Sequence, residues 1–507
     1  MTMIDVAPEM ALLAGTGAAR QETDEAANLP QARQLILMAD AAYELAVSTT
    51  GEPIAIPRRG PRVAVALRGA GGLRASLAAA YYARPPHRTV SSTALTDAIL
   101  VLEGLALASG RVVDLPLRVA EIEGGIVIDL GRQDGRQVRV RPRQWEVISP
   151  ESSDTVFART ALTSAMPIPV PGGTLDELRA LINVTDDSWP LVVGWLVAAL
   201  MPGWPHPVAF PAGEQGTGKT TCARMLVQLV DPSPSPVRKA PKDEDDWVVA
   251  ASGSWVVAVD NISTISAWFS DAICRAVTGE GLIKRRLYTD TDLAVLTMRR
   301  AIMLTTIDAG ALRGDLADRL LTIDLERIPA THRRTDIELM AAFEQARPRI
   351  LGALLDLLAD VLATLPEIEL AEAPRMADFA RVLAAIDHCR GLQALELYAE
   401  QAKELTAKVV ESDVVAPQVI QLMRTRGEWV GSATDLLGLL TPTTRPPHGW
   451  PATAHVLTGR LRRIAPALRD SGIEFSTKRL RGERRVVLTR VADALAVSAA
   501  TTEEEPF

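Results

Sequence analysis

Eight consecutive residues near the middle of the chain decide its fold: Gly213-Glu214-Gln215-Gly216-Thr217-Gly218-Lys219-Thr220. The pattern G-x-x-x-x-G-K-T is that of a phosphate-binding loop between a strand and a helix. An apolar run precedes it, Pro207-Val208-Ala209-Phe210, and apolar residues at helical spacing follow it from Cys222 to Val230. The two flanking patterns predict the strand and the helix that such a loop requires. The sequence therefore predicts a nucleoside triphosphate site rather than a chance glycine-rich turn.

The residue types of the loop explain how it would bind phosphate. Glycines let the backbone N–H groups wrap the phosphates, and the N-terminus of the following helix adds the positive end of its dipole. We expect the eight residues and Thr221 to contact the nucleotide, with Lys219 at the terminal phosphates and the Thr220 hydroxyl on Mg²⁺. The expected cofactors are ATP and Mg²⁺.

A second apolar run ends in a carboxylate, Trp255-Val-Val-Ala-Val-Asp260, and Asp260 follows Lys219 by 41 positions. Behind a phosphate loop, such a strand delivers an acid to the Mg²⁺ of the bound nucleotide. We therefore expect Asp260 to share the metal with Thr220. The alternative is a buried strand that ends in an Asp at a turn.

Composition narrows the class of protein. The chain has 507 residues, enough for several domains, and 54 basic against 62 acidic residues give a net charge of −8. DNA contacts would therefore have to come from local basic patches. Three separated cysteines argue against a disulfide framework or a zinc site. The longest apolar stretch, residues 190–202, is too short to span a bilayer, so we expect a cytoplasmic protein without membrane contact.

Apolar runs alternate with helical patterns between residues 207 and 328, which predicts a parallel sheet with crossover helices. The expected fold class is multidomain, with an α/β P-loop core. We expect strands at 207–211, 236–240, 255–259, 301–306 and 320–325. The expected domains are a disordered segment 1–28, a small α+β domain 29–165, the ATPase domain 174–330, a helical bundle 331–427, a basic module 428–492 and a disordered tail 493–507.

The expected α+β domain contains helical patterns at 32–47 and 92–108 and a hairpin at 119–129 that turns at Gly124-Gly125. It has no Asp-x-Asp carboxylate pair with an accompanying histidine, so no primase site is visible in it. Residues 335–425 are helical by period.

The basic module stands out by its charge. Residues 420–490 carry 13 basic and 5 acidic residues, a local net of 13 − 5 = +8. Two helices, 433–437 and 452–464, and a hairpin at 472–489 turning at Arg481-Gly482 are expected. This layout resembles the winged-helix modules that end phage and plasmid replication helicases, which implies duplex contacts by Arg460, Arg462, Arg463, Lys478 and Arg479. The alternative is a small basic dimerisation domain.

The order of motifs after Asp260 resembles that of superfamily 3 helicases, which have an AAA+-like core, including phage, plasmid and poxvirus-type primase-helicases. The resemblance covers residues 190–330 and rests on three stretches: Thr278-Gly279-Glu280-Gly281, Lys284-Arg285-Arg286-Leu287-Tyr288, and Arg299-Arg300 followed by the strand 301–306. It implies a ring, expected to be a hexamer, whose pore hairpin contacts single-stranded DNA through Lys284, Arg285 and Arg286. The alternative for these residues is a solvated strand face.

The same resemblance implies two further site residues. A polar sensor near the γ-phosphate falls on Thr306 or Thr305, and Arg319, in Asp315-Leu-Ala-Asp318-Arg319, falls on an arginine finger supplied across a subunit boundary. The alternative for Arg319 is an ion pair with Asp315 on one helix face.

Asn261 departs from the pattern of ring-forming ATPases, most of which place a glutamate after the metal-binding acid. Hydrolysis would then use another carboxylate, Asp260 or Glu280, or be slow. Two functions follow from the sequence. One is an ATP-dependent DNA helicase or translocase of a mobile genetic element, and the other is a nucleotide-gated scaffold or sensor ATPase that assembles on DNA or a protein partner.

Overall fold

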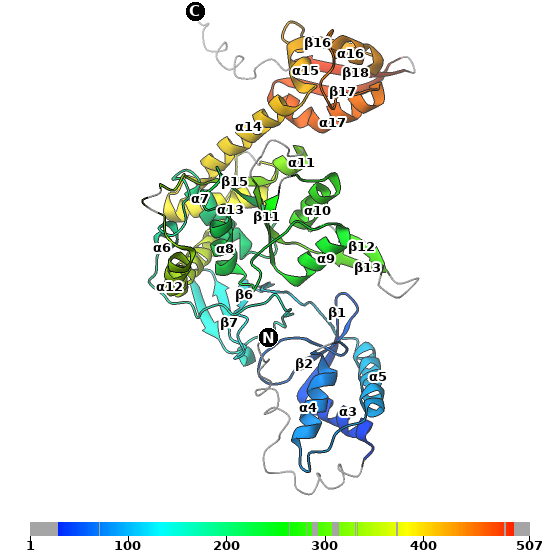
Figure 1. Ribbon diagram of the computed structural model, residues 1–507, viewed down its shortest axis with the longest axis vertical. Helices are drawn as coiled ribbons and strands as arrows, with labels where there is room; N and C mark the ends of the chain where they lie inside the picture. The colour runs from blue at the N-terminus through cyan, green and yellow to red at the C-terminus, as the bar shows by residue number, and fades with distance from the viewer. Residues whose placement is uncertain are drawn as a thin grey trace, which may run out of the picture.

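The computed structural model describes residues 29–69, 71–262, 264–279, 281–285, 293–306, 314–329, 331, 333–371, 374–480 and 483–490. The expected disordered segments, 1–28 and 493–507, lie outside these residues. Figure 1 shows three regions along the long axis, with the nucleotide-loop region in the middle.

A five-stranded sheet forms the centre of the middle region. Its strands are β9 (Val208–Ala212), β10 (Val237–Arg238), β11 (Val256–Ile262), β14 (Ala301–Thr306) and β15 (Leu320–Asp324). Their order is β10-β11-β14-β9-β15, and every neighbouring pair is parallel. The predicted α/β class and the five predicted strands are confirmed. β9, the first strand of this sheet along the chain, lies between β14 and β15. The direction of strand order therefore reverses beside it, which places a crevice at the carboxyl ends of these strands.

Helices make the crossovers between these strands: α8 (Lys219–Val230), α9 (Glu244–Gly253), α10 (Ala267–Thr278) and the short α11 (Gly314–Ala317). The sheet also rests on α7 (Trp189–Ala199), whose residues are all buried. A helix that is apolar on every side has to lie inside the protein. The short α6 (Asp176–Arg179) precedes it.

The long helix α12 (Asp336–Thr364) and α13 (Ala377–Arg390), joined by the 3-10 turn η4 (Leu365–Glu367), belong to the same hydrophobic core as the sheet. The contact is close, because a Cβ atom on Gly194 of α7 would lie 2.3 Å from Leu383 Cδ2 of α13. The domain boundary expected at 330/331 therefore does not separate two cores.

A second sheet packs on the same core. It consists of β5 (Val119–Ile122), β6 (Gly125–Asp129), β7 (Gln137–Arg141) and β8 (Gln144–Ile148), antiparallel in that order, and is followed by the 3-10 turn η1 (Pro150–Ser152). Its inward side chains join the core of the parallel sheet. The predicted hairpin is present, but Ile122 pairs with Gly125, so its two-residue loop is Glu123-Gly124, with Gly124 at φ +72°.

A buried ion pair fastens this antiparallel sheet to the parallel one. Arg118 is 0% exposed, and its Nε donates to Asp231 Oδ1 at 2.8 Å. The other Asp231 oxygen accepts the backbone N–H groups of Trp255 and Val256, both at 2.9 Å, at the start of β11. The second half of the segment 29–165 is thus built into the nucleotide-loop region.

The first half of that segment has its own core. It contains α3 (Gln31–Ala42), β1 (Tyr43–Ser48), β2 (Pro53–Pro57), β3 (Val65–Ala66), α4 (Leu73–Ala83), α5 (Ser92–Ala108) and β4 (Val112–Val113). The helix predicted at 92–108 is confirmed. The helix predicted at 32–47 is wrong after Ala42, because residues 43–47 pair antiparallel with residues 53–57. Strand pairing here overrides the helical spacing of the apolar residues.

The C-terminal region stands on the long helix α14 (Ala394–Ser412), as Figure 1 shows. It contains α15 (Ala416–Met423), β16 (Glu428–Gly431), α16 (Ala433–Leu440), α17 (Ala454–Asp470), β17 (Ile473–Leu480) and β18 (Glu483–Arg490), with the strand order β16-β18-β17. The two predicted helices and the predicted hairpin are present around a separate core. The turn of this hairpin, Arg481-Gly482, lies outside the described residues. Over the part of the chain that the structure describes, no helix is both long and apolar enough to cross a membrane.

Candidate nucleotide site

The phosphate-loop sequence forms a tight backbone turn between β9 and α8. Gly213, Gly216 and Gly218 have φ angles of +145°, +86° and +87°, which side chains disfavour. A Cβ atom on Gly213 would lie 2.9 Å from Thr217 Oγ1 and 3.0 Å from the carbonyl oxygen of Leu325. The Thr217 hydroxyl donates to the carbonyl of Glu214 at 3.0 Å. The loop therefore has the close-packed, glycine-dependent form that its sequence predicts.

Lys219 is the first residue of α8, and its ammonium group lies on the loop itself. Nζ donates to the carbonyl oxygens of Gly213, at 2.7 Å, and Glu214, at 2.8 Å. Phosphate oxygens entering the loop would compete with these two carbonyls for the same cation. The side chain thus lies within the loop that it is expected to serve.

Asp260, near the end of β11, contacts hydroxyl groups from two other elements. The Thr220 hydroxyl donates to the carboxylate, with Oγ1 at 3.1 Å from Oδ1 and 3.2 Å from Oδ2. The Thr305 hydroxyl, from β14, also donates to Asp260 Oδ1. The predicted metal pair, Thr220 and Asp260, is therefore brought together at the carboxyl ends of β9, β11 and β14.

A β-bulge places Asp260 in this position. Val259 pairs with Leu304 and Ile262 pairs with Thr306, so two residues of β11, Asp260 and Asn261, oppose the single residue Thr305. Asn261 adopts a left-handed backbone conformation, φ +55°, which Asn tolerates better than most residues. Its N–H group donates to Thr305 Oγ1 at 3.0 Å. Bulges of this kind re-aim side chains beside active sites.

The structure describes the side chain of one of the two candidate sensors. Thr305 is 3% exposed, and its hydroxyl accepts from Asn261 and donates to Asp260. The side chain of Thr306, the other candidate, lies outside the described residues. The sequence names Thr305 as a sensor candidate but does not predict its contact with Asp260, because strand alternation alone does not reveal a bulge. The Asp260-Asn261 dipeptide at a strand end was its only signal.

The side chains at this edge suit Mg²⁺. Thr220 and Asp260 offer a hydroxyl and a carboxylate, which are hard oxygen ligands, and Mg²⁺ usually takes only one or two protein ligands besides phosphate oxygens and water. No group of three or more His, Cys, Asp or Glu side chains suited to a metal occurs among the described residues. A site with fewer protein ligands is therefore the one this chain can provide.

Arg319 lies at the amino ends of the parallel strands, whereas this site lies at their carboxyl ends. Its carbonyl accepts from Val208 N at 2.8 Å, at the amino end of β9, whereas the phosphate loop follows the carboxyl end of β9. The guanidinium Nη1 lies 3.6 Å from Cys274 Sγ of α10. Its neighbour Asp318 pairs with Arg375. The side chain of Asp315, the alternative partner of Arg319, is outside the described residues.

The expected pore hairpin is present as β12 (Gly281–Arg285) and β13 (Leu293–Thr297), which pair antiparallel and form a sheet of their own. In Figure 1 this hairpin extends away from the parallel sheet. The backbone places Lys284 and Arg285 near the far end of β12. The structure does not describe the side chains of Lys284 and Arg285, and it does not describe Arg286 or Glu280 at all. The roles of these residues therefore stay predictions.

The five predicted duplex-binding residues divide into two groups. Arg460 is half-buried, with Nε donating to Asp413 Oδ2 at 2.8 Å and Nη1 donating to the carbonyl of Gly449 at 2.8 Å. It therefore fastens α17 to the preceding chain. Exposed side chains make up the other group: Arg462, Arg463, Lys478 and Arg479.

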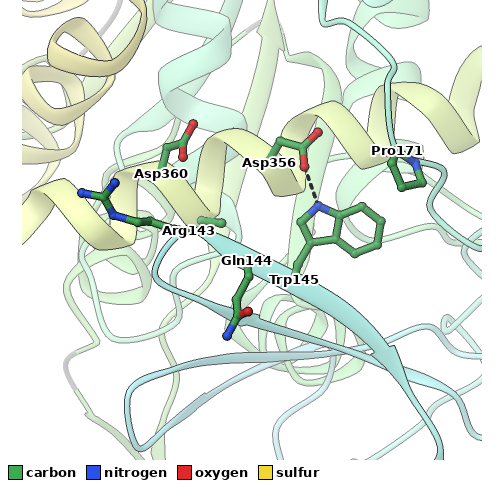
Figure 2. A pocket seen from close by; sticks show the side chains of 7 residues that line it. Arg143, Gln144, Trp145, Pro171, Asp356 and Asp360 are labelled. Carbon is green, nitrogen blue, oxygen red and sulfur yellow. Dashed lines mark hydrogen bonds between the residues drawn. The ribbon is translucent and has the colours of Figure 1, made fainter.

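Another cavity, of about 480 Å³, lies between the β7–β8 turn and α12 (Figure 2). The indole N–H of Trp145 donates to Asp356 Oδ1 at 2.7 Å, and Asp360 pairs with Arg390 at 2.7 Å. None of the predicted site residues lines it. Its carboxylates are engaged within the chain, and we assign it no part in nucleotide binding.

Two buried ionisable groups are excluded from chemistry by their surroundings. Burial raises the pKa of the Cys222 thiol, on α8, to about 12, so it stays protonated and is no nucleophile. Burial also lowers the pKa of His206 to about 4, and its Nε2 bonds to the carbonyl of Ala198 at 2.7 Å. Both side chains serve the core.

Two family models match consecutive parts of the chain. Residues 175–408 match the actinomycete integrative conjugative element replication protein, and residues 415–502 match the AICE RepA C-terminal domain. The first stretch includes the phosphate loop, the bulge and β15, and the second includes α15 to β18. These matches relate the chain to the replication proteins of conjugative elements. No curated protein matches it.

Among solved structures, the apo NrS-1 C-terminal region is 13% identical with a TM-score of 0.39, and the match covers 92% of this chain and 100% of that chain. A JCV helicase bound to a small molecule is 12% identical with a TM-score of 0.22, over 46% of this chain and 70% of that chain. Similarity at these TM-scores is too distant to support a conclusion about function.

Proposed function

We propose that this protein is an ATP-dependent DNA helicase or translocase that acts in the replication of an integrative conjugative element. One observation carries the proposal: the phosphate loop with Lys219 on it and the Asp260 carboxylate held by Thr220 and Thr305 meet at the carboxyl edge of the parallel sheet. The family-model matches to a replication protein support the biological setting.

Each residue of the site has a task in binding and hydrolysis. The loop N–H groups and Lys219 hold the phosphates, and Thr220 and Asp260 hold Mg²⁺, which neutralises the charge that develops on the transferring phosphoryl group. Thr305 fixes the carboxylate through its hydroxyl, and the bulge fixes Thr305 through the Asn261 N–H group. The protein thereby orients its acid before nucleotide binds, which reduces the reorganisation required during reaction.

The position of Arg319 supports a ring in which it acts as a finger. Arg319 lies at the amino end of β9, and the phosphate loop begins after its carboxyl end. Five residues of strand separate the two levels, about 16 Å at ~3.3 Å per residue. An arginine side chain does not span that distance, so Arg319 would serve the nucleotide of a neighbouring subunit. We expect a closed homo-oligomer, most simply a hexamer, with single-stranded DNA in its pore and duplex at the C-terminal module.

ATP turnover with and without DNA tests this function. Wild-type protein with Mg²⁺ should hydrolyse ATP, and single-stranded DNA should raise the rate. Lys219→Ala should lose ATP binding, measured by calorimetry, and keep its fold, measured by circular dichroism. Lys239→Ala is the matched control, because Lys239 is an exposed lysine beyond β10 and outside the loop. Equal ATP affinity in Lys219→Ala and in the control would refute the site.

Asn261 supports a second candidate, a nucleotide-gated scaffold or sensor ATPase. The residue after the metal-binding acid is an exposed amide and not a carboxylate, so it does not act as a base for the attacking water. In this reading ATP binding drives assembly, and turnover is slow and insensitive to DNA. The DNA dependence of turnover decides between the two.

A further inference from the structure

A groove in the C-terminal region lies apart from the nucleotide site and from the cavity beside Trp145. A cavity of about 290 Å³ opens between α17, the start of α16 and the β17–β18 hairpin. Its polar wall comes from three elements and consists of His455, Thr458, Arg462, Thr477 and Arg484. Only Arg462 among these was expected from the sequence to contact DNA.

The hairpin beside the groove concentrates positive charge in a way that costs stability in isolation. Arg479 of β17 lies directly opposite Arg484 of β18, and Lys478 lies directly opposite Arg485. Like charges in directly opposite cross-strand positions repel each other. Arg462, Arg479 and Arg484 are exposed, and none of the three is paired with a carboxylate of the described residues. An anion bound between them would relieve the repulsion.

Gly459, in the middle of α17, forms part of the groove wall. Glycine inside a helix is unfavourable relative to most residues, and here no packing inside the protein requires it. A Cβ atom on Gly459 would have no heavy atom within 4 Å. Its absence leaves open space beside Arg462, where another molecule can approach the helix backbone.

We propose that this groove seats a backbone phosphate of duplex DNA. The guanidinium groups of Arg462 and Arg484 donate to the phosphate oxygens in charge-assisted bonds, and the hydroxyls of Thr458 and Thr477 add neutral donors. Arg479 and Lys478 continue the positive charge along the hairpin past the groove, so the surface suits a polyanion better than a single free phosphate. This inference rests on the proposed duplex contact of the C-terminal module and specifies its seat.

Salt-dependent binding of a fluorescent duplex to the full-length protein tests the seat. The double variant Arg462→Ala/Arg484→Ala should lower the slope of log affinity against log salt by about one, and weaken binding roughly 8-fold at 0.1 M salt, because the two arginines share one phosphate and each lost phosphate contact removes about 0.9 from the slope. The matched control is Arg426→Ala/Arg469→Ala, which removes two exposed arginines of the same region outside the groove. It should leave the slope unchanged.

A steric variant tests the same seat without removing charge. Gly459→Gln places a side chain at the groove and should weaken duplex binding while raising the thermal stability of the module, since Gln favours helix more than Gly. Gly438→Gln on α16 is its control, because a Cβ atom there also meets no heavy atom within 4 Å and Gly438 does not line the groove. It should stabilise the module without changing its affinity for duplex DNA.

The outcomes separate the seat from the proposed function. Equal salt slopes in the two double variants, with wild-type binding intact, would overturn the seat and leave duplex binding by the module standing. Unchanged duplex binding after deletion of residues 428–490 would overturn the module's role itself. Inorganic phosphate at constant ionic strength should not displace the duplex. Displacement would identify the groove as a site for the free anion and contradict the proposal.

Discussion

The Thr305 hydroxyl gives the sharpest test of the site geometry. Thr305→Val keeps the shape of the buried side chain and removes both of its hydrogen bonds, one donated to Asp260 and one accepted from the Asn261 N–H group. A hydrogen bond to a charged group contributes about 1.5–3 kcal/mol. If that bond aligns Asp260 for catalysis, kcat/KM for ATP should fall about 10-fold to 150-fold, at ~1.4 kcal/mol per factor of ten.

Steady-state ATP hydrolysis with Mg²⁺ measures this effect, and calorimetry shows whether ATP binding is retained. Thr305→Ser is the control, because it keeps the hydroxyl and should retain most activity. Thr306→Val is the comparison for the other sensor candidate. A large loss in Thr306→Val combined with wild-type activity in Thr305→Val would refute the bulge geometry as the device that positions Asp260.

Three further predictions concern the core and the subunit boundary. Replacing Arg118 by Met leaves Asp231 buried without its cation and should lower the free energy of unfolding, measured in denaturant, by about 3–5 kcal/mol. Arg132→Met is the control, because it breaks only an exposed pair with Asp134 and should cost about 1 kcal/mol or less. Equal losses in the two variants would contradict the fastening role of Arg118. Because the pKa of His206 is lowered to about 4 by burial, below its unfolded value, its contribution to stability is complete above about pH 6.5 and is lost as pH falls from there toward 4. Between pH 7 and pH 5, the free energy of unfolding should therefore fall by about 2 kcal/mol less in His206→Gln than in the wild type. If the two proteins lose the same free energy of unfolding over this range, His206 titrates normally. Arg319→Ala should bind ATP and lose turnover roughly 10³-fold, and mixing it with Lys219→Ala should restore part of the activity at hybrid boundaries; no recovery in the mixture would count against a shared site.

Local patterns predicted the features that depend on neighbouring residues. The phosphate loop follows from glycine positions within eight residues, and the five parallel strands follow from short apolar runs bounded by breakers. Asp260 followed from its place at the end of such a run. The structure places Thr220 within 3.2 Å of both carboxylate oxygens of Asp260, so the predicted metal pair is adjacent in space.

Sequence patterns did not predict the features that depend on contacts between distant residues. The helix expected at 32–47 turns into a strand at Tyr43 because residues 53–57 pair with it. The charge of Arg460 suggested a DNA contact, but Asp413 and the Gly449 carbonyl take its donors. The antiparallel sheet at 119–148 shares the core of the nucleotide region, and the buried charge of Arg118 finds its partner 113 positions away. Pattern reasoning sees periodicity along the chain and not these pairings.

Unwinding of a labelled forked duplex by the full-length protein tests the central claim most directly. With ATP and Mg²⁺, the wild-type protein should release the labelled strand, and Lys219→Ala, which lacks the loop cation, should release none above background. Lys239→Ala should behave as wild type. Strand release that needs no ATP, or equal release by wild type and Lys219→Ala, would contradict the claim that nucleotide at this loop drives movement on DNA.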